Sequence, residues 1–273
     1  MVEQIPEKFG DYVYFVREKQ FPPETHIQTE YTKRGIQKHV TKKETIGSYT
    51  VYGRHPAYHL GLDMSKSQQE TEVETVLDMV EIPWIPKRAL RHTVVDKIKM
   101  NDDHSLIAFT VDIGNNERCT GGIKNMKTQK VVPNIKIEGI SQMEFFGRDQ
   151  DGNDILYYVE LNEINRPYKV MRKVIGGPTD QQDTVIFIDD DPTHFVDIAV
   201  SKDKKCLFIN SGTKEDSEIW VIPCIHDGQT VPYDLTPKLL VERIPDVRVH
   251  IEHIRNFFLI ISNNDLGSKN YRL

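Results

Sequence analysis

Serine, histidine and aspartate are the side chains through which this sequence could catalyse hydrolysis, so their spacing is tested first. A nucleophilic serine on a strand-to-helix elbow needs a G-x-S-x-G context, because the sharp turn exposes its hydroxyl. The 273-residue sequence contains no such motif. Ser211-Gly212 and Gly267-Ser268 lack the second glycine and fall in expected hairpin turns. A Ser-His-Asp triad is recognised by geometry, so the sequence predicts no catalytic residue.

Residues that could bind a metal are poorly spaced. His250 and His253 are three positions apart in an expected strand, so we expect one histidine inside and one outside. The run Asp189-Asp190-Asp191-Pro192 lacks the alternating acids, central glycine and distal glutamate of a calcium loop. We expect a solvated turn there, since aspartate and proline both favour turns. The sequence therefore predicts no metal and no cofactor.

The three cysteines, Cys119, Cys206 and Cys224, show no C-x-x-C spacing, which disfavours zinc and redox roles. An odd number of cysteines in a long chain is typical of buried thiols in a reducing compartment, so we expect a cytoplasmic protein. No stretch approaches the ~20 apolar residues of a spanning helix, and the N-terminus shows no apolar leader segment.

The charge balance limits the partners. A net charge of −6 and a pI of about 5.9 argue against nucleic-acid binding as the main role. One basic segment departs from this balance, with Lys33, Arg34, Lys38, Lys42 and Lys43. We expect a solvated loop there; weak contact with an acidic partner is the alternative.

Short apolar strands recur in pairs separated by polar turns. The pairs span residues 95–109, 140–159, 195–209 and 247–261. Their first strands align on Ile98, Met143, Ile198 and Val249, at spacings of 45, 55 and 51 residues. Third strands are expected at 122–126, 168–172 and 219–222. Periods of this size built from short strands are typical of β-propeller blades.

The predicted fold is all-β, a partial propeller of four-stranded antiparallel blades. Residues 92–273 supply fewer than four units of about 50 residues. An irregular first blade precedes them, with an insertion at about 18–71 that could hold one hairpin. We therefore expect four to five blades, open at the C-terminal end, because residues 270–273 fall where a third strand of the last unit belongs.

Several segments resemble the N-terminal propeller of the prolyl oligopeptidase family of serine peptidases, in its oligopeptidase B and prolyl endopeptidase-like branches. Residues 161–172, L-N-E-I-N-R-P-Y-K-V-M-R, are similar to the family's L-x-E-x-x-R-P-Y-x-V-x-R. Residues 211–222 resemble its S-x-S-K-x-T-S-E-V-W-x-L segment. Further similar segments lie at 111–127, 250–264 and 270–273. The resemblance covers 9–17 and 72–273, whereas 18–71 match poorly. Two positions depart from the pattern: the family's S-P-D-G-type turn is replaced at 100–104, and Cys119 replaces an aromatic residue.

The resemblance implies a seven-bladed propeller that caps an α/β-hydrolase domain carrying Ser, Asp and His. It admits short peptides and shields the catalytic site from folded proteins. We therefore expect residues 1–273 to be the non-catalytic propeller portion of a serine oligopeptidase, inactive alone and gating a hydrolase domain absent from this sequence. The expected partners are that hydrolase domain, in the same chain or in trans, and short peptides, with no nucleic acid and no membrane.

Other readings remain open at this point. The chain could be a stand-alone binding or regulatory propeller fragment, a piece of a longer chain, or the propeller of a prolyl endopeptidase-like esterase. Glu163 and Arg166 are the candidate site residues, because they flank the turn of the 161–172 segment. We expect either an interdomain or substrate-gate contact from them, or a β-turn with an internal Glu163–Arg166 pair.

Overall fold

A computed structural model describes residues 7–21, 24–31, 37–44, 48–56, 73–177, 182–222 and 236–263. Its strands form antiparallel sheets, and the only helices among the described residues are two short 3-10 segments, η3 (Met79–Glu81) and η4 (Lys87–His92). The chain divides into two compact units, residues 1–91 and 92–273. Each unit is described by itself below.

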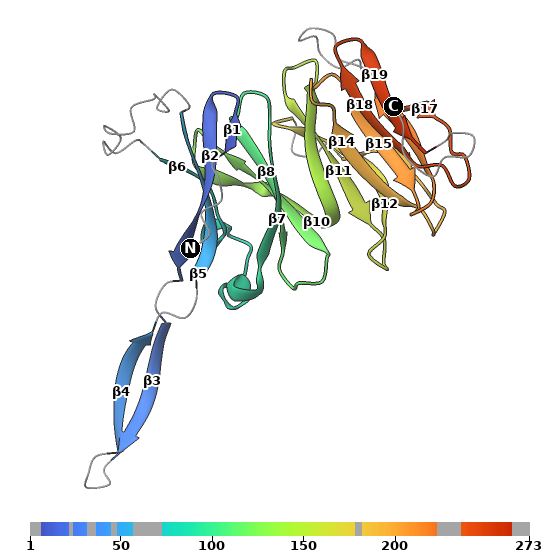
Figure 1. The fold of residues 1–273 in the computed structure, drawn as a ribbon. Helices are drawn as coiled ribbons and strands as arrows, with labels where there is room; N and C mark the ends of the chain where they lie inside the picture. Colours follow the sequence, from blue (N-terminus) through green and yellow to red (C-terminus); the bar gives the residue numbers. More distant parts are fainter. Residues whose placement is uncertain are drawn as a thin grey trace. The chain divides into compact units, whose positions relative to one another are not determined.

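Unit 1 contains one four-stranded sheet, blade I, and one separate hairpin. Blade I has the order β1-β2-β5-β6, with β1 at Glu7–Phe9, β2 at Tyr12–Gln20, β5 at Ser48–Pro56 and β6 at Glu74–Asp78. Between β2 and β5 the chain makes a two-stranded sheet from β3 (Glu24–Tyr31) and β4 (Gln37–Glu44) (Figure 1). Strand β5 therefore lies within the stretch expected to be an insertion, and it pairs with β2 along its whole length.

Unit 2 contains the repeating strands. A seven-stranded sheet in the order β13 to β7 holds blades II and III, followed by a four-stranded sheet, blade IV, and a two-stranded sheet, blade V (green to red in Figure 1). The strands of the seven-stranded sheet are β7 (Val94–Met100), β8 (Leu106–Asp112), β9 (Cys119–Asn125), β10 (Lys130–Arg148), β11 (Asp154–Leu161), β12 (Pro167–Ile175) and β13 (Thr184–Ile188). Blade IV has β14 (Phe195–Val200), β15 (Leu207–Gly212), β16 (Ser217–Ile222) and β17 (Lys238–Val241), and blade V has β18 (Val249–Ile254) and β19 (Phe257–Ser262). The predicted strand pairs and third strands are confirmed, while residues 270–273 lie outside the described residues.

Blades II and III share one sheet because β10 is a single long strand. Its first half pairs with β9 as the fourth strand of blade II, and its second half pairs with β11 as the first strand of blade III. The pairing changes partner near Gly139, which has φ +72°. Glycine adopts this left-handed conformation without the steric cost that a Cβ brings. The four-stranded blades predicted from the sequence are present, and two of them share one sheet because this strand belongs to both.

In blades II to IV the second strand is buried along most of its length. On β11, Ile155, Tyr157 and Val159 pack towards blade IV, whereas Leu156 and Tyr158 pack among residues of blades II and III. Both faces of the strand are thus covered, which explains its continuous apolar run. A strand with one exposed face would instead alternate apolar and polar residues. A further apolar cluster joins blades IV and V.

Strand β19 is the exception to this rule. It is the second strand of blade V, yet Phe257 is 71% exposed, and the next four residues are 37–40% exposed. Among the described residues β19 pairs with β18 alone. The sequence of β19 is typical of a strand that is buried on both faces, so we expect another surface to pack against its exposed apolar residues. The open C-terminal end predicted from the repeat is confirmed.

Candidate functional site

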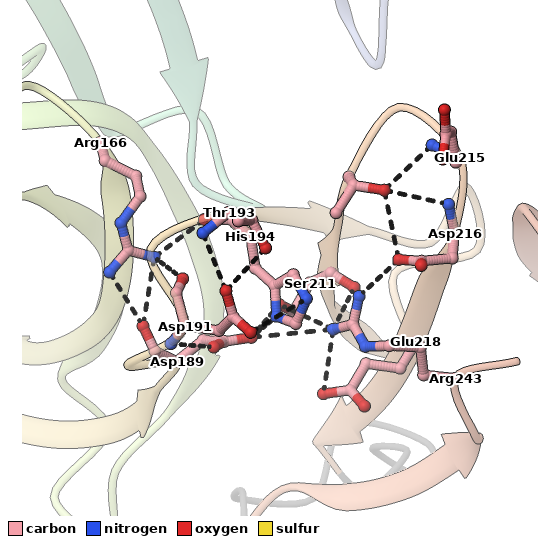
Figure 2. A network of polar contacts seen from close by, with 11 residues as sticks. Arg166, Asp189, Asp191, Thr193, His194, Ser211, Glu215, Asp216, Glu218 and Arg243 are labelled. Carbon is pink, nitrogen blue, oxygen red and sulfur yellow. Dashed lines mark hydrogen bonds and ion pairs between the residues drawn. The ribbon is translucent and has the colours of Figure 1, made fainter. Parts of the chain in front are cut away.

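The connection between blades III and IV holds a network of polar side chains (Figure 2). It is centred on the carboxylate of Asp189, which follows β13. The Ser211 hydroxyl of β15 donates to Asp189 Oδ2, and the His194 ring nitrogen Nδ1 lies 3.0 Å from the same oxygen. The backbone N–H of Asp191 also donates to Asp189 Oδ1, over 2.9 Å. The network therefore brings a serine, a histidine and an aspartate together.

The order of these three groups excludes a hydrolytic triad. A triad places histidine between serine and aspartate, so that the imidazole can take the serine proton. Here the carboxylate lies between the other two, and no Ser211–His194 hydrogen bond occurs among the described residues. Ser211 is also fully buried, at 0% exposure. This arrangement holds two strands and a link together and does not present a nucleophile to a substrate.

Arg243, after β17, completes the network on its blade IV side. Its Nη1 lies 2.9 Å from Asp216 Oδ1, and its Nη2 lies 3.7 Å from both Asp189 Oδ2 and Glu218 Oε1. The same Nη2 donates to the Ser211 carbonyl over 3.0 Å. Burial alone would raise the pKa of Asp189, but hydrogen bonds from Ser211, Asp191 N and His194 outweigh it and hold that pKa below its ordinary value.

Arg166 ties the preceding hairpin to the same link. It closes the β11–β12 turn, where Asn165 has φ +60° and the Asn162 side chain accepts from the Arg166 backbone N–H. The Arg166 side chain is buried, and its Nη1 donates to the carbonyls of Asp189 (3.2 Å), Asp191 (2.8 Å) and His194 (2.8 Å). The guanidinium thus fixes the backbone of the 189–194 link from blade III, while Asp189 fixes it to blade IV.

Glu163 and Arg166, the two candidate residues, are not brought together. Glu163 is exposed at the tip of the turn, and the described ion pairs include none between the two. The expected internal pair is therefore wrong, because Arg166 turns inward to carbonyl groups, which leave no mark in the sequence. The interdomain or substrate-gate role of these residues stays a prediction.

A second set of polar contacts joins the turns between first and second strands. Asn101 Nδ2 donates to Asp154 Oδ2 over 3.0 Å, which links blades II and III. Lys204 Nζ lies 2.7 Å from Asp102 Oδ1, so this pair reaches from blade IV to blade II. We call these contacts, together with those of Asp203 with His253 and Arg255, the turn ties. They continue through every described blade of unit 2.

Blades IV and V are tied by Asp203 and His253. Asp203 Oδ2 lies 2.8 Å from His253 Nδ1 and accepts from the Arg255 N–H over 3.1 Å. Burial would raise the pKa of Asp203, but hydrogen bonds from Ser201, Lys205 N and His253 hold it below its ordinary value. His253 is 4% exposed and packs edge-on against Phe258, whereas His250 is exposed. The prediction of one histidine inside and one outside is confirmed.

Other expected features are resolved as follows. Within the described ranges, no three histidine, cysteine or acidic side chains gather as a metal site would require. A search of the same residues for helices of membrane-spanning length and hydropathy found none.

Cys119 and Cys206 are buried, as predicted, and Cys224 lies outside the described residues. Burial raises the pKa of the Cys119 thiol to about 11. The 189–191 run does form a turn before β14, but the Asp189 side chain is only 12% exposed, so the solvated turn was wrong at that residue.

Comparison with known proteins places these blades in a family. The profile of the prolyl oligopeptidase N-terminal beta-propeller domain matches residues 26–273. The chain is 28% identical over 174 residues to prolyl endopeptidase-like of Gallus gallus, covering 62% of this chain and 21% of that protein. It is 28% identical over 229 residues to Protease 2 of Moraxella lacunata, covering 82% and 30%.

Solved structures show the same fold. Oligopeptidase B from Trypanosoma brucei, in a closed form with covalently bound antipain, superposes with a TM-score of 0.66 at 22% identity, covering 96% of this chain and 31% of that one. Oligopeptidase B from Leishmania major gives 0.65 at 20% identity, covering 89% and 31%. The chain thus spans less than a third of the length of these relatives. Since the propeller profile matches nearly the whole sequence, the chain belongs to the prolyl oligopeptidase family and corresponds to its N-terminal β-propeller domain.

Proposed function

We propose that this chain is the non-catalytic propeller portion of a serine oligopeptidase and gates the access of short peptides to a hydrolase domain. The observation that carries the proposal is the match to the family's propeller domain over residues 26–273. The relatives it matches include Protease 2 and solved oligopeptidases, of which it covers about 30%. The sequence has no G-x-S-x-G elbow, so the catalytic step would belong to a separate domain, in the same chain or in trans.

The packing supports a mechanical role. A filter excludes large substrates only if its opening keeps a fixed width. Blades II to V are joined by buried apolar clusters, and polar contacts tie the links and turns between them. Burying each large aliphatic side chain contributes about 1.5–3 kcal/mol, so separating two blades would be costly.

The first experiment asks whether the chain is inactive alone. The purified chain is incubated with a serine-reactive fluorophosphonate probe and with a short fluorogenic peptide ending in arginine. We expect neither labelling nor turnover above buffer. Turnover that disappears in Ser211→Ala would assign catalysis to this chain and overturn the proposal, whereas turnover that persists in that variant would indicate a contaminating hydrolase.

The second experiment tests gating. The hydrolase domain of Protease 2, produced separately, is assayed with and without this chain on the short peptide and on casein. The proposal predicts that casein cleavage falls while peptide cleavage is preserved. An equal fall in both would favour a regulator that blocks the active site, and no change in either would reject gating in trans.

A stand-alone binding module is the second candidate, and the exposed apolar residues of β19 favour it. An edge strand of this kind can pair with another protein. If so, the chain should capture the separate hydrolase domain, and Phe258→Lys should abolish that capture. If the chain gates only a hydrolase domain of its own chain, the unchanged chain should not capture the separate domain. An esterase branch would be recognised by turnover of short esters, but not peptides, by the reconstituted pair.

A further inference from the structure

The face of blade III that packs against blade IV carries three buried donor groups that lack an acceptor. They are the side-chain Nε2 of Gln142 on β10, the hydroxyl of Tyr157 on β11 and the Nε of Arg172 on β12. Within the described part of the chain, no group forms a hydrogen bond with any of these three atoms. Because an unsatisfied buried donor is costly, each of these groups calls for an acceptor from outside the chain.

The register of the sheet brings the three donors to one face. Tyr157 lies directly opposite Arg172, and Gln142 lies opposite Val159, two positions further along β11. Opposite residues of antiparallel strands share a side, with Cβ atoms about 4.5–5.5 Å apart, and diagonal neighbours lie about 7–8 Å apart. Tyr157 and Val159 belong to the apolar cluster that joins blades III and IV, so the donors face that seam.

The three groups have the chemistry of an anion site. Burial raises the pKa of Tyr157, so its hydroxyl keeps its proton at neutral pH and can donate. Arg172 adds a positive charge, and a water molecule could accept from only two of the three donors. The blade IV members of the cluster have apolar side chains, which supply no acceptor: Val196, Ile198, Leu207, Ile209 and Ile222.

Two carboxylates lie near these donors, and both are engaged elsewhere. Glu144 is on the same face of β10 but forms an ion pair with Lys99 of blade II. Asp149, in the β10–β11 turn, accepts from the Asn153 backbone N–H over 2.8 Å and from its Nδ2 over 3.0 Å. Neither carboxylate accepts from any of the three donor atoms. An anion from solution would supply the acceptor that these two acids do not.

We propose that a small anion of halide size binds to the Tyr157 hydroxyl, the Arg172 Nε and the Gln142 Nε2, and stabilises the packing of blade III on blade IV. A buried charge is tolerated where it is paired, and the anion and the guanidinium would neutralise each other. A charged acceptor also strengthens the hydrogen bonds that it receives. The inference rests on the packing within unit 2 and is independent of the gating role.

The test is the melting temperature of the intact chain as sodium chloride replaces sodium gluconate at constant total salt, so that general screening stays the same. We expect the melting temperature to rise with chloride and then level off. The rise should be about 3–6 °C when chloride is at ten times its dissociation constant. Tyr157→Phe removes one donor but keeps the ring, so it should lose most of this rise.

Tyr158→Phe is the matched control. Tyr158 is the next residue, packs on the opposite face of β11, and donates its hydroxyl to Asp183 over 2.7 Å. This variant should melt at a lower temperature than the parent and keep the full chloride-dependent rise. Gln142→Leu tests the site from a second strand, and it should also reduce the rise, whether or not Tyr157→Phe folds.

Three results would overturn the proposal. The parent could melt at the same temperature in chloride and in gluconate. The rise could persist in full in both Tyr157→Phe and Gln142→Leu, which would place the anion at another site. Tyr157→Phe could also lose stability equally in the two salts, which would assign the hydroxyl to a bound water molecule.

Discussion

Replacing Arg166 with methionine should destabilise the connection between blades III and IV more than any exposed substitution nearby. The guanidinium donates to three backbone carbonyls at 2.8–3.2 Å from a buried position. A hydrogen bond from a charged donor contributes about 1.5–3 kcal/mol. Methionine removes this donor from all three carbonyls, of which that of Asp191 still accepts from the His194 N–H, and it also removes the desolvation cost of a buried cation. We therefore expect a net loss of about 2–4 kcal/mol in the free energy of unfolding.

Urea unfolding followed by far-UV circular dichroism measures this loss. The midpoint should fall while the slope stays unchanged, since the surface exposed on unfolding is the same. Glu163→Gln is the matched control, because it removes a charge from the exposed tip of the same turn and should cost less than about 0.5 kcal/mol. Arg166→Lys keeps the charge but loses the planar fork, so its loss should be intermediate.

An Arg166→Met variant within about 0.5 kcal/mol of the parent would refute this account. It would mean that the link between β13 and β14 is held without the guanidinium. An equal loss in Glu163→Gln would also contradict it, because that result would assign the effect to the turn rather than to the carbonyl acceptors.

Three further predictions follow from individual residues. In the folded chain the pKa of Asp203 lies below its ordinary value. The carboxylate therefore stabilises the fold above about pH 4, and this contribution is lost as the pH falls through the folded pKa. The difference in melting temperature between the parent and Asp203→Asn should shrink in acid. Because burial raises the pKa of Cys119 to about 11, its thiol should resist a disulfide reagent at pH 8 until the chain is unfolded in urea. Gly139→Ala should cost about 1–2 kcal/mol in urea melts because of the left-handed backbone; the Arg118 guanidinium, 2.5 Å from the new Cβ, can move aside.

The blades could be predicted from the sequence because their burial is periodic. The first strands were aligned on Ile98, Met143, Ile198 and Val249, and all four residues lie in first strands of the structure. A second strand that packs on both faces is apolar at most positions, and this is visible in the sequence. The sequence did not indicate that β10 is continuous, because its turning point is one glycine, Gly139, in a stretch where isoleucines alternate with polar residues.

The polar networks could not be predicted in the same way. Arg166 binds backbone carbonyls, which every residue carries, so no partner residue type marks the contact. Asp189 was expected to be solvated because acidic runs before prolines usually are, and its burial depends on Ser211 and Arg243 from distant strands. The separate pairing of β3 with β4 also depends on a register that alternation in either strand alone does not fix.

The two sets of polar contacts should differ in their response to salt, and this difference bears on gating. The Lys204–Asp102 pair is exposed, with side chains 41% and 71% accessible, so it contributes at most about 1 kcal/mol and is screened by added salt. The Arg166 contacts are buried and largely protected from screening. Any salt-induced loosening should therefore begin at the turn ties.

Hydrogen exchange at 50 mM and 500 mM NaCl checks this expectation. We expect amides of the 201–205 turn to exchange faster at the higher salt while those of the 189–194 link do not change. Lys204→Met should reproduce the fast exchange at low salt, because it removes the pair without removing the aliphatic stem. If both segments loosened together, unit 2 would open as one body, and a gate located at the turns would have no mechanical basis.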